Sequence, residues 1–225
     1  MKGKIIAIDG PAGSGKSTTA KLVAQRLGFL YLDTGAMYRA LTWKALQNKV
    51  NLEDEGKLER LALDSKINFK NIKGENKIFL DDEEVSFPIR KPEVDQNVSM
   101  VSKHPKVRKI LVGWQKEIGK KQNLVAEGRD TATVVFPEAE LKVYLDCNIE
   151  ERGKRRAKEL NEKGVSFSSK DALENLKERD RIDSERETSP LKKDKDAIVI
   201  DTTNLTIEQQ VERVIKLAKG KFKSI

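Results

Sequence analysis

The stretch Gly10-Pro11-Ala12-Gly13-Ser14-Gly15-Lys16-Ser17 decides the fold. Residues 5–8 before it form a β-branched run typical of a buried strand, and the segment after it, up to Leu27, has a helical period. The stretch fits the pattern G-x-x-x-x-G-K-S, whose glycines let the backbone wrap around phosphate oxygens at a helix N-terminus. Lys16 is expected to reach the β- and γ-phosphates of a nucleotide, and the Ser17 hydroxyl to ligate Mg²⁺. We therefore predict a P-loop fold, which does not by itself define a reaction.

Three further short apolar runs are predicted to be strands, at residues 124–126, 141–145 and 197–200. Each is followed by a segment of helical period, and strands that alternate with helices favour an α/β fold, a parallel sheet with helices on both faces. Alternating residues around Lys73-Gly74-Glu75-Asn76 break this order and predict a small antiparallel β insert. Pro92 and Pro105 mark the starts of two helices.

Composition limits the class of protein. The 225 residues, 37% hydrophobic and 36% charged, suffice for one domain with an inserted subdomain and exclude disorder as the main state. The single Cys147 suits a reducing compartment, and with the single His104 it leaves no Cys or His cluster for a metal. No apolar run approaches the roughly 18 residues of a membrane span, so we expect a cytoplasmic protein. The net charge of +8 predicts anionic partners.

Two later segments carry further candidates for anion binding. Thr34 is expected to cap a helix whose first turns present Tyr38 and Arg39, although a solvated arginine on a capped helix explains the pattern equally well. Gly128-Arg129-Asp130 follows a predicted strand, and the carboxyl ends of parallel strands line the binding crevice of an open α/β sheet. Arg129 and Asp130 are therefore expected to face the same cleft as the phosphate-binding loop.

A third candidate lies in the charge-rich segment near residue 180. Arg179, Asp183 and Arg186 occur at i, i+4 and i+7 of one predicted helix, which puts them on one helical face. The alternative for so dense a run of charges is an exposed helix laced with salt bridges.

Together these segments resemble the cytidylate kinase family over nearly the whole chain. The resemblance rests on the phosphate-binding loop, on Leu32-Asp33-Thr34-Gly35-Ala36-Met37-Tyr38-Arg39, on Gly128-Arg129-Asp130 leading to Thr133-Val134-Val135-Phe136-Pro137, on Glu178-Arg179-Asp180 with Asp183 and Arg186, and on Asp201-Thr202-Thr203-Asn204-Leu205-Thr206. The family usually continues Gly-Arg-Asp with Ile-Gly-Thr, whereas this chain has Thr131-Ala132-Thr133, and Glu127 stands where Asp is also common. Both departures lie near the acceptor site and bear on fine specificity rather than on the reaction class.

The resemblance implies an organisation and a reaction. The core would comprise residues 1–33, 122–149 and 171–225, the monophosphate-binding region residues 34–121 with a β insert at 60–92, and a helical lid residues 150–170. The reaction would transfer the γ-phosphoryl group of ATP to CMP or dCMP with Mg²⁺. The residues implied to bind ATP are Gly10, Pro11, Ala12, Gly13, Ser14, Gly15, Lys16, Ser17, Thr18 and Arg155. The residues implied to bind the acceptor are Thr34, Tyr38, Arg39, Ser99, Arg108, Arg129, Asp130, Arg179, Asp183 and Arg186.

Individual roles are also implied by the resemblance. Thr34, Arg39, Arg129 and Arg186 would hold the monophosphate, Ser99, Arg108 and Asp130 would meet the cytosine, and Arg179 and Asp183 would meet the ribose. The residues implied to be catalytic are Lys16, Arg129, Arg155, Arg156 and Arg186. Arg152, Arg155 and Arg156 share one helical face, the geometry that a lid over ATP needs. Asp33 is either a partner of Mg²⁺ through water or a loop and cap residue.

The residue types suit transfer to a phosphate. A phosphate acceptor with a second pKa of about 6 already carries a nucleophilic oxygen at neutral pH, so no general base is needed. Asp130 can accept a hydrogen bond from the N4 amino group of cytosine, and uracil offers an acceptor at the same place. Asp130 could instead serve as a base toward a hydroxyl.

Two rival functions remain open. A different P-loop small-molecule kinase would lack the Gly-Arg-Asp and Arg-Asp-Arg sets. A nucleic-acid-binding ATPase would use the positive charge directly, but the chain has only 5% aromatic residues and no aromatic-basic interleaving. We therefore expect a monomer that binds small nucleotides and neither nucleic acid nor membrane.

Overall fold

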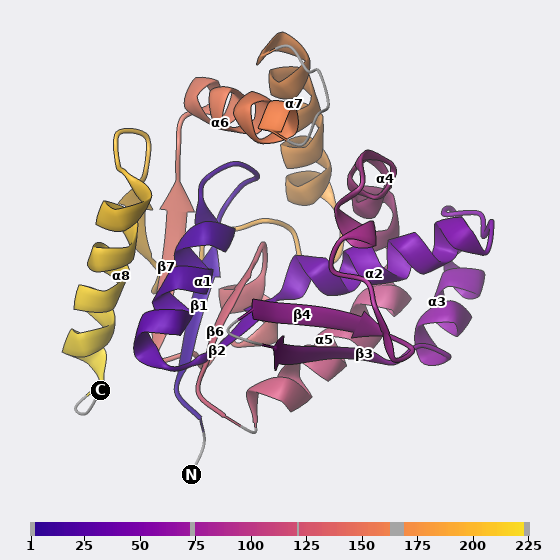
Figure 1. Cartoon of the computed structure of the whole chain (residues 1–225), viewed down its shortest axis with the longest axis horizontal. Helices are drawn as coiled ribbons and strands as arrows, with labels where there is room; N and C mark the ends of the chain where they lie inside the picture. The colour runs from indigo at the N-terminus through magenta and orange to yellow at the C-terminus, as the bar shows by residue number, and fades with distance from the viewer. Residues whose placement is uncertain (1–2, 73–74, 121, 163–168, 223–225) are drawn as a thin grey trace. The chain divides into compact units, whose positions relative to one another are not determined.

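The computed structural model describes residues 3–72, 75–120, 122–162 and 169–222 (Figure 1). The strands are β1 (Ile5–Asp9), β2 (Leu30–Asp33), β3 (Ile67–Ile72), β4 (Glu75–Leu80), β5 (Glu83–Glu84), β6 (Leu124–Gly128), β7 (Leu141–Asp146) and β8 (Ile198–Asp201). The helices are α1 (Lys16–Leu27), α2 (Thr34–Gln47), α3 (Glu55–Leu63), α4 (Pro92–Ser102), α5 (Pro105–Gly119), α6 (Ile149–Glu162), α7 (Ser169–Glu185) and α8 (Ile207–Lys221). Two short turns are also helical, the 3₁₀ turn η1 (Pro88–Arg90) and the π-helical turn η2 (Thr131–Val135).

The main sheet has the strand order β2-β6-β1-β7-β8. Strand β1 pairs in parallel with β6 and with β7, and β7 pairs in parallel with β8. The register places Asp9, the last residue of β1, beside Gly128 of β6 and beside Tyr144 of β7. The phosphate-binding loop and Arg129-Asp130 therefore begin next to each other at the carboxyl edge of the sheet, where ligands of open α/β sheets bind.

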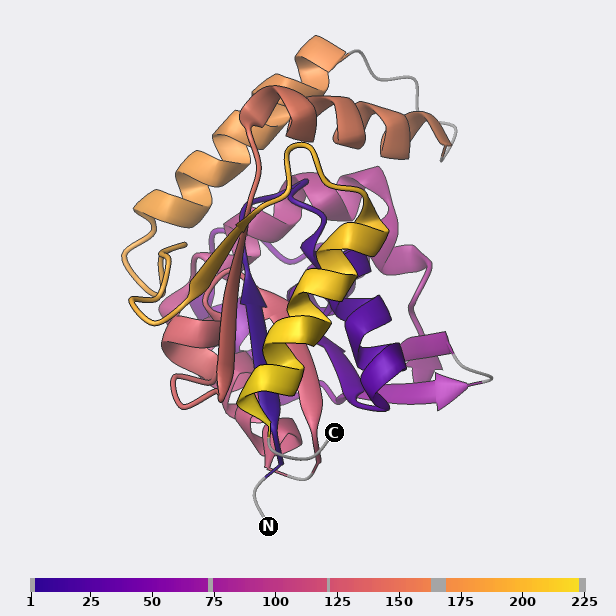
Figure 2. The ribbon, with the colours of Figure 1, turned by 90° about the vertical axis from the view of Figure 1, so that its left-hand side faces the viewer.

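Helices α1 and α8 cover one face of this sheet (Figure 2). Ile6, Ile8 and Val143 of the strands form a buried core with Val23 of α1 and Val211 of α8. Burial of these side chains holds α1, and with it the phosphate-binding loop, against the sheet.

Helices α6 and α7 pack on each other beyond the carboxyl ends of the strands (Figure 2). Together they include most of the predicted lid, residues 150–170, of which residues 163–168 lie outside the described part of the chain. The closing of this pair over ATP stays a prediction.

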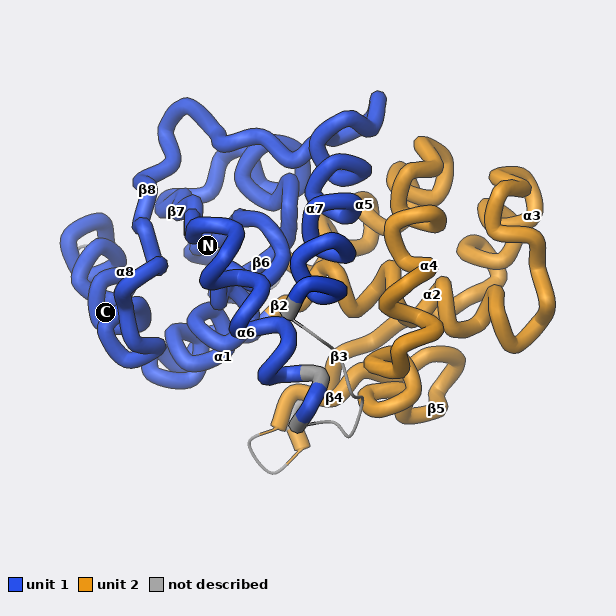
Figure 3. The backbone as a smooth tube through the Cα atoms, turned by 90° about the horizontal axis from the view of Figure 1, so that it is seen from above, with its two compact units in different colours: residues 1–31, 122–225 blue, residues 32–121 orange. Residues whose placement is uncertain are grey.

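The chain divides into two compact units, one of residues 1–31 and 122–225 and one of residues 32–121 (Figure 3). The second unit contains helices α2 to α5 and an antiparallel sheet of the order β3-β4-β5. Its core includes the fully buried side chains of Met37, Leu41, Leu58 and Leu111. Its role in binding a monophosphate stays a prediction.

The predicted fold class is confirmed: the protein is α/β, with a parallel sheet, helices packed on it and a small antiparallel element. Helices α4 and α5 begin at Pro92 and Pro105, as the positions of the prolines indicate. The sequence did not predict β2. Its residues Leu30-Tyr31-Leu32-Asp33 show neither a long apolar run nor a polar alternation, and two of the four are only half-buried.

Candidate functional site

The phosphate-binding loop joins β1 to α1 inside the first unit. Gly15 precedes α1 with a φ of 89°, a left-handed conformation that favours glycine. A Cβ atom on Gly10 would lie 2.3 Å from the carbonyl oxygen of Leu145, so the close approach of the loop to β7 excludes a side chain. The loop thus brings the N-terminus of α1, with its free N–H groups and positive dipole, to the edge of the sheet.

Lys16 is buried at the start of α1, and its Nζ donates to the carbonyl oxygen of Pro11 at 3.2 Å. Burial and then the nearby positive charge of Arg129 lower the pKa of Lys16 to about 7. An anionic group beside Lys16 would restore its charge, as expected for a lysine that binds phosphate.

Ser17 is bonded to Glu127, which the sequence marked only as a departure near the acceptor site and gave no site role; the structure places it against the phosphate-binding loop instead. Ser17 Oγ donates to Oε1 of Glu127 at 2.7 Å, and the hydroxyl of Tyr31 donates to the same oxygen at 3.3 Å. Glu127 is buried in β6 and pairs with Ile8, the residue before the last of β1, so the strand register brings it close to the phosphate-binding loop and to Ser17. A carboxylate on a buried strand beside such a loop is the signal that could have identified it.

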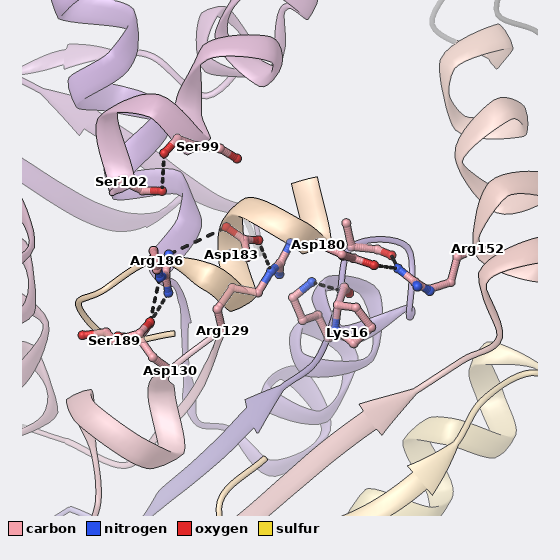
Figure 4. Close-up of polar contacts among 12 residues, drawn as sticks. Lys16, Ser99, Ser102, Arg129, Asp130, Arg152, Asp180, Asp183, Arg186 and Ser189 are labelled. Carbon is pink, nitrogen blue, oxygen red and sulfur yellow. Dashed lines mark hydrogen bonds and ion pairs between the residues drawn. The ribbon is translucent and has the colours of Figure 1, made fainter. Parts of the chain in front are cut away.

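A cluster of Arg129, Asp130, Asp183 and Arg186 lies beside this loop (Figure 4); the last three are buried, and the Arg129 side chain is 13% exposed. Nε of Arg129 donates to Oδ2 of Asp183 at 2.8 Å. Burial alone would raise the pKa of Asp183, but Arg129, Arg179 and Arg186 hold that pKa below its usual value. Asp183 therefore stays ionised and fixes the arginines around it.

Arg186 lies one residue beyond the end of α7, but its backbone N–H still donates to the carbonyl oxygen of Ile182, one helical turn earlier, and its side chain lies on the predicted face beside Asp183. Its Nε donates to the carbonyl oxygen of Ser189 at 2.7 Å, and its terminal nitrogens lie 3.8 Å from Asp130 Oδ1 and 3.7 Å from Asp183 Oδ1 (Figure 4). The interpretation of an exposed, salt-bridged helix is wrong for this face, because Asp183 and Arg186 are buried. It fits Arg181, which is exposed and bound to Glu178 and Glu185.

Asp9 is a second buried carboxylate to which the sequence gave no site role. It ends β1 and accepts hydrogen bonds from the backbone N–H groups of Thr131 and Ala132 and from the Thr131 hydroxyl. It joins the strand before the phosphate-binding loop to the turn after Arg129-Asp130. A lone Asp at the end of an apolar strand is the only local sign of this contact.

The three arginines of α6 have different partners, although they share one face of the helix. Arg152 is buried, donates to the carbonyl oxygens of Ala12 and Cys147 at 3.1 Å each, and lies 2.5 Å from Asp180 Oδ2. Arg155 donates to the carbonyl oxygen of Thr202 at 2.7 Å. Arg156 pairs with Glu159 of its own helix at 2.8 Å. Arg152 and Arg155 thus attach α6 to the phosphate-binding loop and to the end of β8.

In the second unit, Asp33 rather than Thr34 caps α2. Oδ1 of Asp33 accepts from the N–H of Ala36 at 2.8 Å, and Oδ2 lies 2.5 Å from Nη2 of Arg90. Thr34 is the first helical residue, so its predicted capping role is wrong. An aspartate accepts the free N–H groups of a first turn at least as well as a threonine does. Burial alone would raise the pKa of Asp33, but Arg90 and Arg39 hold it below its usual value.

The other candidates of the second unit lie on α2, α4 and α5. Arg39 pairs with Asp95 of α4 at 2.9 Å. Arg108 is 2% exposed, donates to the carbonyl oxygen of Ser102 at 3.1 Å, and has its guanidinium carbon 5.1 Å from the centre of the Tyr38 ring. Ser99 is buried one turn before Ser102 on α4. A buried arginine, a tyrosine and two serines thus gather within one unit.

The fold and the site define a class: a P-loop kinase, which is a nucleotide-binding transferase. A family model described as Cytidylate kinase matches residues 6–220. The chain belongs to the cytidylate kinase family, as its sequence motifs indicated.

Individual relatives agree with this membership. The cytidylate kinase of Caldanaerobacter subterraneus subsp. tengcongensis is 50% identical over 218 residues, 97% of this chain and 96% of that protein. The cytidylate kinase of Enterococcus faecalis is 46% identical over 220 residues, 97% of each chain. An uncharacterised protein from Eubacterium ventriosum has a similar fold, with a TM-score of 0.51 at 13% identity over 95% of this chain and 97% of that one. Among the described residues, no helix combines the length and apolar character of a membrane span.

Proposed function

We propose that this chain transfers the γ-phosphoryl group of ATP to CMP, and also to dCMP, giving CDP or dCDP and ADP. The observation that carries the proposal is the largely buried cluster of Arg129, Asp130, Asp183 and Arg186 beside the phosphate-binding loop. Two arginines there supply positive charge to a second phosphate group, and Asp130 supplies a hydrogen-bond acceptor for an amino group of the base.

The chain's residues act by position and charge. The transition state of phosphoryl transfer is loose and carries charge on the equatorial oxygens of the transferred group. Lys16 and the backbone N–H groups of the loop bind the donor phosphates, while Arg129 and Arg186 bind the acceptor phosphate and bring the two anions together. The acceptor oxygen is already deprotonated at neutral pH, so no side chain has to remove a proton.

The remaining acceptor contacts are proposed from family membership. Besides Arg129, Asp130, Asp183 and Arg186, they comprise Thr34, Tyr38, Arg39, Ser99, Arg108 and Arg179. On the donor side, Gly10, Pro11, Ala12, Gly13, Ser14, Gly15, Ser17, Thr18 and Arg155 join Lys16. We further propose that the chain acts as a monomer in the cytoplasm.

Ser17 and Glu127 are proposed to hold Mg²⁺ together with the nucleotide. Both present oxygen atoms, the ligands that Mg²⁺ prefers, and Ser17 Oγ lies 2.7 Å from Glu127 Oε1. Bound Mg²⁺ neutralises charge on the β- and γ-phosphate oxygens. Asp33, the other candidate, has one carboxylate oxygen on the N–H of Ala36 and the other on Arg90, so its geometry favours the cap role.

Glu127→Gln is expected to raise the free Mg²⁺ concentration for half-maximal rate by about tenfold, because the carboxylate proposed to hold the metal loses its negative charge. KM for CMP is expected to change by less than about twofold. Initial rates measured against free Mg²⁺ at saturating ATP check this, with Asp33→Asn as the comparison. An unchanged Mg²⁺ requirement in Glu127→Gln, or an increased one in Asp33→Asn, would contradict the assignment.

The arginines of α6 are expected to have two kinds of role: Arg152 attaches the helix to the phosphate-binding loop, and Arg155 and Arg156 act in catalysis. Arg152→Ala should lower the free energy of unfolding by about 2–4 kcal/mol, because it removes the hydrogen-bond partner of two buried carbonyl oxygens and of the half-buried Asp180. Arg156→Ala should lower kcat by at least about tenfold with little change in KM for CMP. Arg155→Ala should lower kcat in the same way, but it also removes the hydrogen bond to the Thr202 carbonyl oxygen, so a loss of stability is expected to accompany it. Thermal unfolding and steady-state kinetics of the three variants measure both effects. Unchanged stability of Arg152→Ala, or a rise only in KM for CMP in Arg156→Ala, refutes this division.

An ADP-release assay with CMP, dCMP, UMP, AMP and single-stranded DNA as second substrates tests the proposed function. CMP and dCMP should give the highest kcat/KM. Preference for a non-nucleotide acceptor would indicate another small-molecule kinase. Stimulation by DNA rather than by a monophosphate would indicate a nucleic-acid-dependent ATPase.

A further inference from the structure

We propose that Asp9 is a positioning residue for the acceptor nucleotide: it caps turn η2 from the end of β1 and so keeps the Asp130 carboxylate available to the base. The inference rests on the proposed function, in which Asp130 recognises cytosine. It assigns to Asp9 a role that is exerted through Asp130.

The contacts of Asp9 are those of an N-cap side chain. Turn η2 begins directly after Asp130, and its first two backbone N–H groups both donate to Asp9. Thr131 N lies 2.9 Å from Asp9 Oδ1, and Ala132 N lies 2.8 Å from Asp9 Oδ2. Asp9 therefore caps a turn that lies 122 residues later in the chain. The turn itself is π-helical, a rare arrangement that often marks functional sites.

Asp130 occupies the N-cap position of η2, but its own side chain makes no capping hydrogen bond. An aspartate at this position normally accepts the first free N–H groups of its own turn. Asp9 already binds the N–H of Ala132, one of the two groups that an N-cap side chain usually accepts, so this hydrogen bond is denied to Asp130. The Asp130 carboxylate lies instead 3.8 Å from Arg186 Nη2, inside the cluster. Asp9 thus holds the backbone next to Asp130 and favours the orientation in which the Asp130 carboxylate faces the cluster.

The burial of Asp9 is unfavourable for the fold. The residue is 2% exposed, and burial raises the pKa of its carboxyl to about 6 in spite of the hydrogen bonds from Thr131 and Ala132. A neutral side chain would avoid this unfavourable burial of charge. The carboxylate of Asp9 is therefore expected to be present because it positions turn η2, not because it stabilises the fold.

Thr131 strengthens the same contact. Its hydroxyl donates to Oδ1 of Asp9, the oxygen that also accepts its backbone N–H. An aliphatic side chain at position 131 would donate through the backbone alone. The hydroxyl is thus a third donor to Asp9. Removing it by substitution at position 131 weakens the cap and leaves Asp9 unchanged.

The first test compares Asp9→Asn with Glu140→Gln in the full chain. An amide has one oxygen, so Asn at position 9 cannot accept from both Thr131 and Ala132, and Asp130 is expected to turn onto the freed N–H. KM for CMP should rise about tenfold if the fraction of molecules whose Asp130 carboxylate faces the base falls to about a tenth. KM for ATP should change by less than about twofold, since the phosphate-binding loop keeps its contacts.

Glu140 provides the matched control, because its carboxylate accepts the backbone N–H of Ile5 at 2.8 Å, at the opposite end of β1. Glu140→Gln makes the same change from carboxylate to amide and should leave both KM values unchanged. A melting temperature of Asp9→Asn within about 5 °C of the parent would show that the fold is retained.

Thr131→Val and Thr131→Ser form the second test, which applies even if Asp9→Asn does not fold. The valine removes only the hydroxyl and should raise KM for CMP about threefold. The serine restores the donor and should return KM for CMP to the parent value. Equal effects of the two variants would contradict a role of the hydroxyl and count against the proposal.

A double variant shows whether Asp9 acts through Asp130. In an Asp130→Ala background, Asp9→Asn should not change KM for CMP further. Additive effects, or an equal rise in KM for ATP, would overturn the proposal. If the proposed function is wrong, the result is different: Asp130→Ala alone would then leave kcat/KM for CMP unchanged.

Discussion

Arg129→Lys is expected to lower kcat/KM for CMP by about 100-fold while the protein remains folded. Arg129 uses Nε to hold Asp183 at 2.8 Å, a geometry in which its two terminal nitrogens can meet a phosphate as a fork. A lysine keeps the positive charge but has one nitrogen, which can contact either Asp183 or the phosphate. The loss should appear mainly in kcat, because Arg129 is proposed to lie where charge develops in the transition state.

Arg181→Lys is the matched control for this variant. Arg181 lies on α7 and is bound to Glu178 and Glu185, but it is exposed and lies outside the cluster. The same substitution there should change kcat/KM by less than about twofold, as usual for a surface ion pair. Steady-state kinetics with CMP and ATP measure both variants. Retention of more than a tenth of the activity by Arg129→Lys would contradict its assigned role.

Asp130→Asn is expected to narrow the preference for CMP over UMP by about 100-fold. A carboxylate only accepts hydrogen bonds, so it matches the amino group of cytosine and opposes the carbonyl oxygen of uracil. The amide of asparagine both donates and accepts, so kcat/KM should fall by about tenfold for CMP and rise by about tenfold for UMP. Arg186 should keep its place in this variant, because the Ser189 carbonyl and Asp183 also hold it.

The measurement is kcat/KM for CMP and UMP with Asp130→Asn, beside Asp196→Asn. Asp196 is an exposed residue after α7, so this control makes the same change in net charge away from the cluster. Unchanged selectivity of Asp130→Asn would remove Asp130 from base recognition. A parallel loss for both substrates would assign it to the acceptor phosphate region.

Local sequence patterns predicted the elements whose causes are local. The phosphate-binding loop lies between β1 and α1 because its glycines and its flanking apolar runs are contiguous. Pro92 and Pro105 start helices because proline suits a first helical position. Local reasoning failed at the ends of elements. Asp33 took the cap expected of Thr34, and α7 ended one residue before Arg186, because neighbouring residues can fill the same end position and a local pattern does not choose between them.

The chain's sequence by itself determined the α/β class, the loop that binds a nucleotide and the family of kinases. Only the tertiary structure decided that Glu127 meets Ser17, that Arg152 anchors α6, and that Asp9 caps the turn after Asp130. These pairs are separated by 110 to 140 residues. Each arises from strand register and the need of buried polar groups for partners, which no local pattern records.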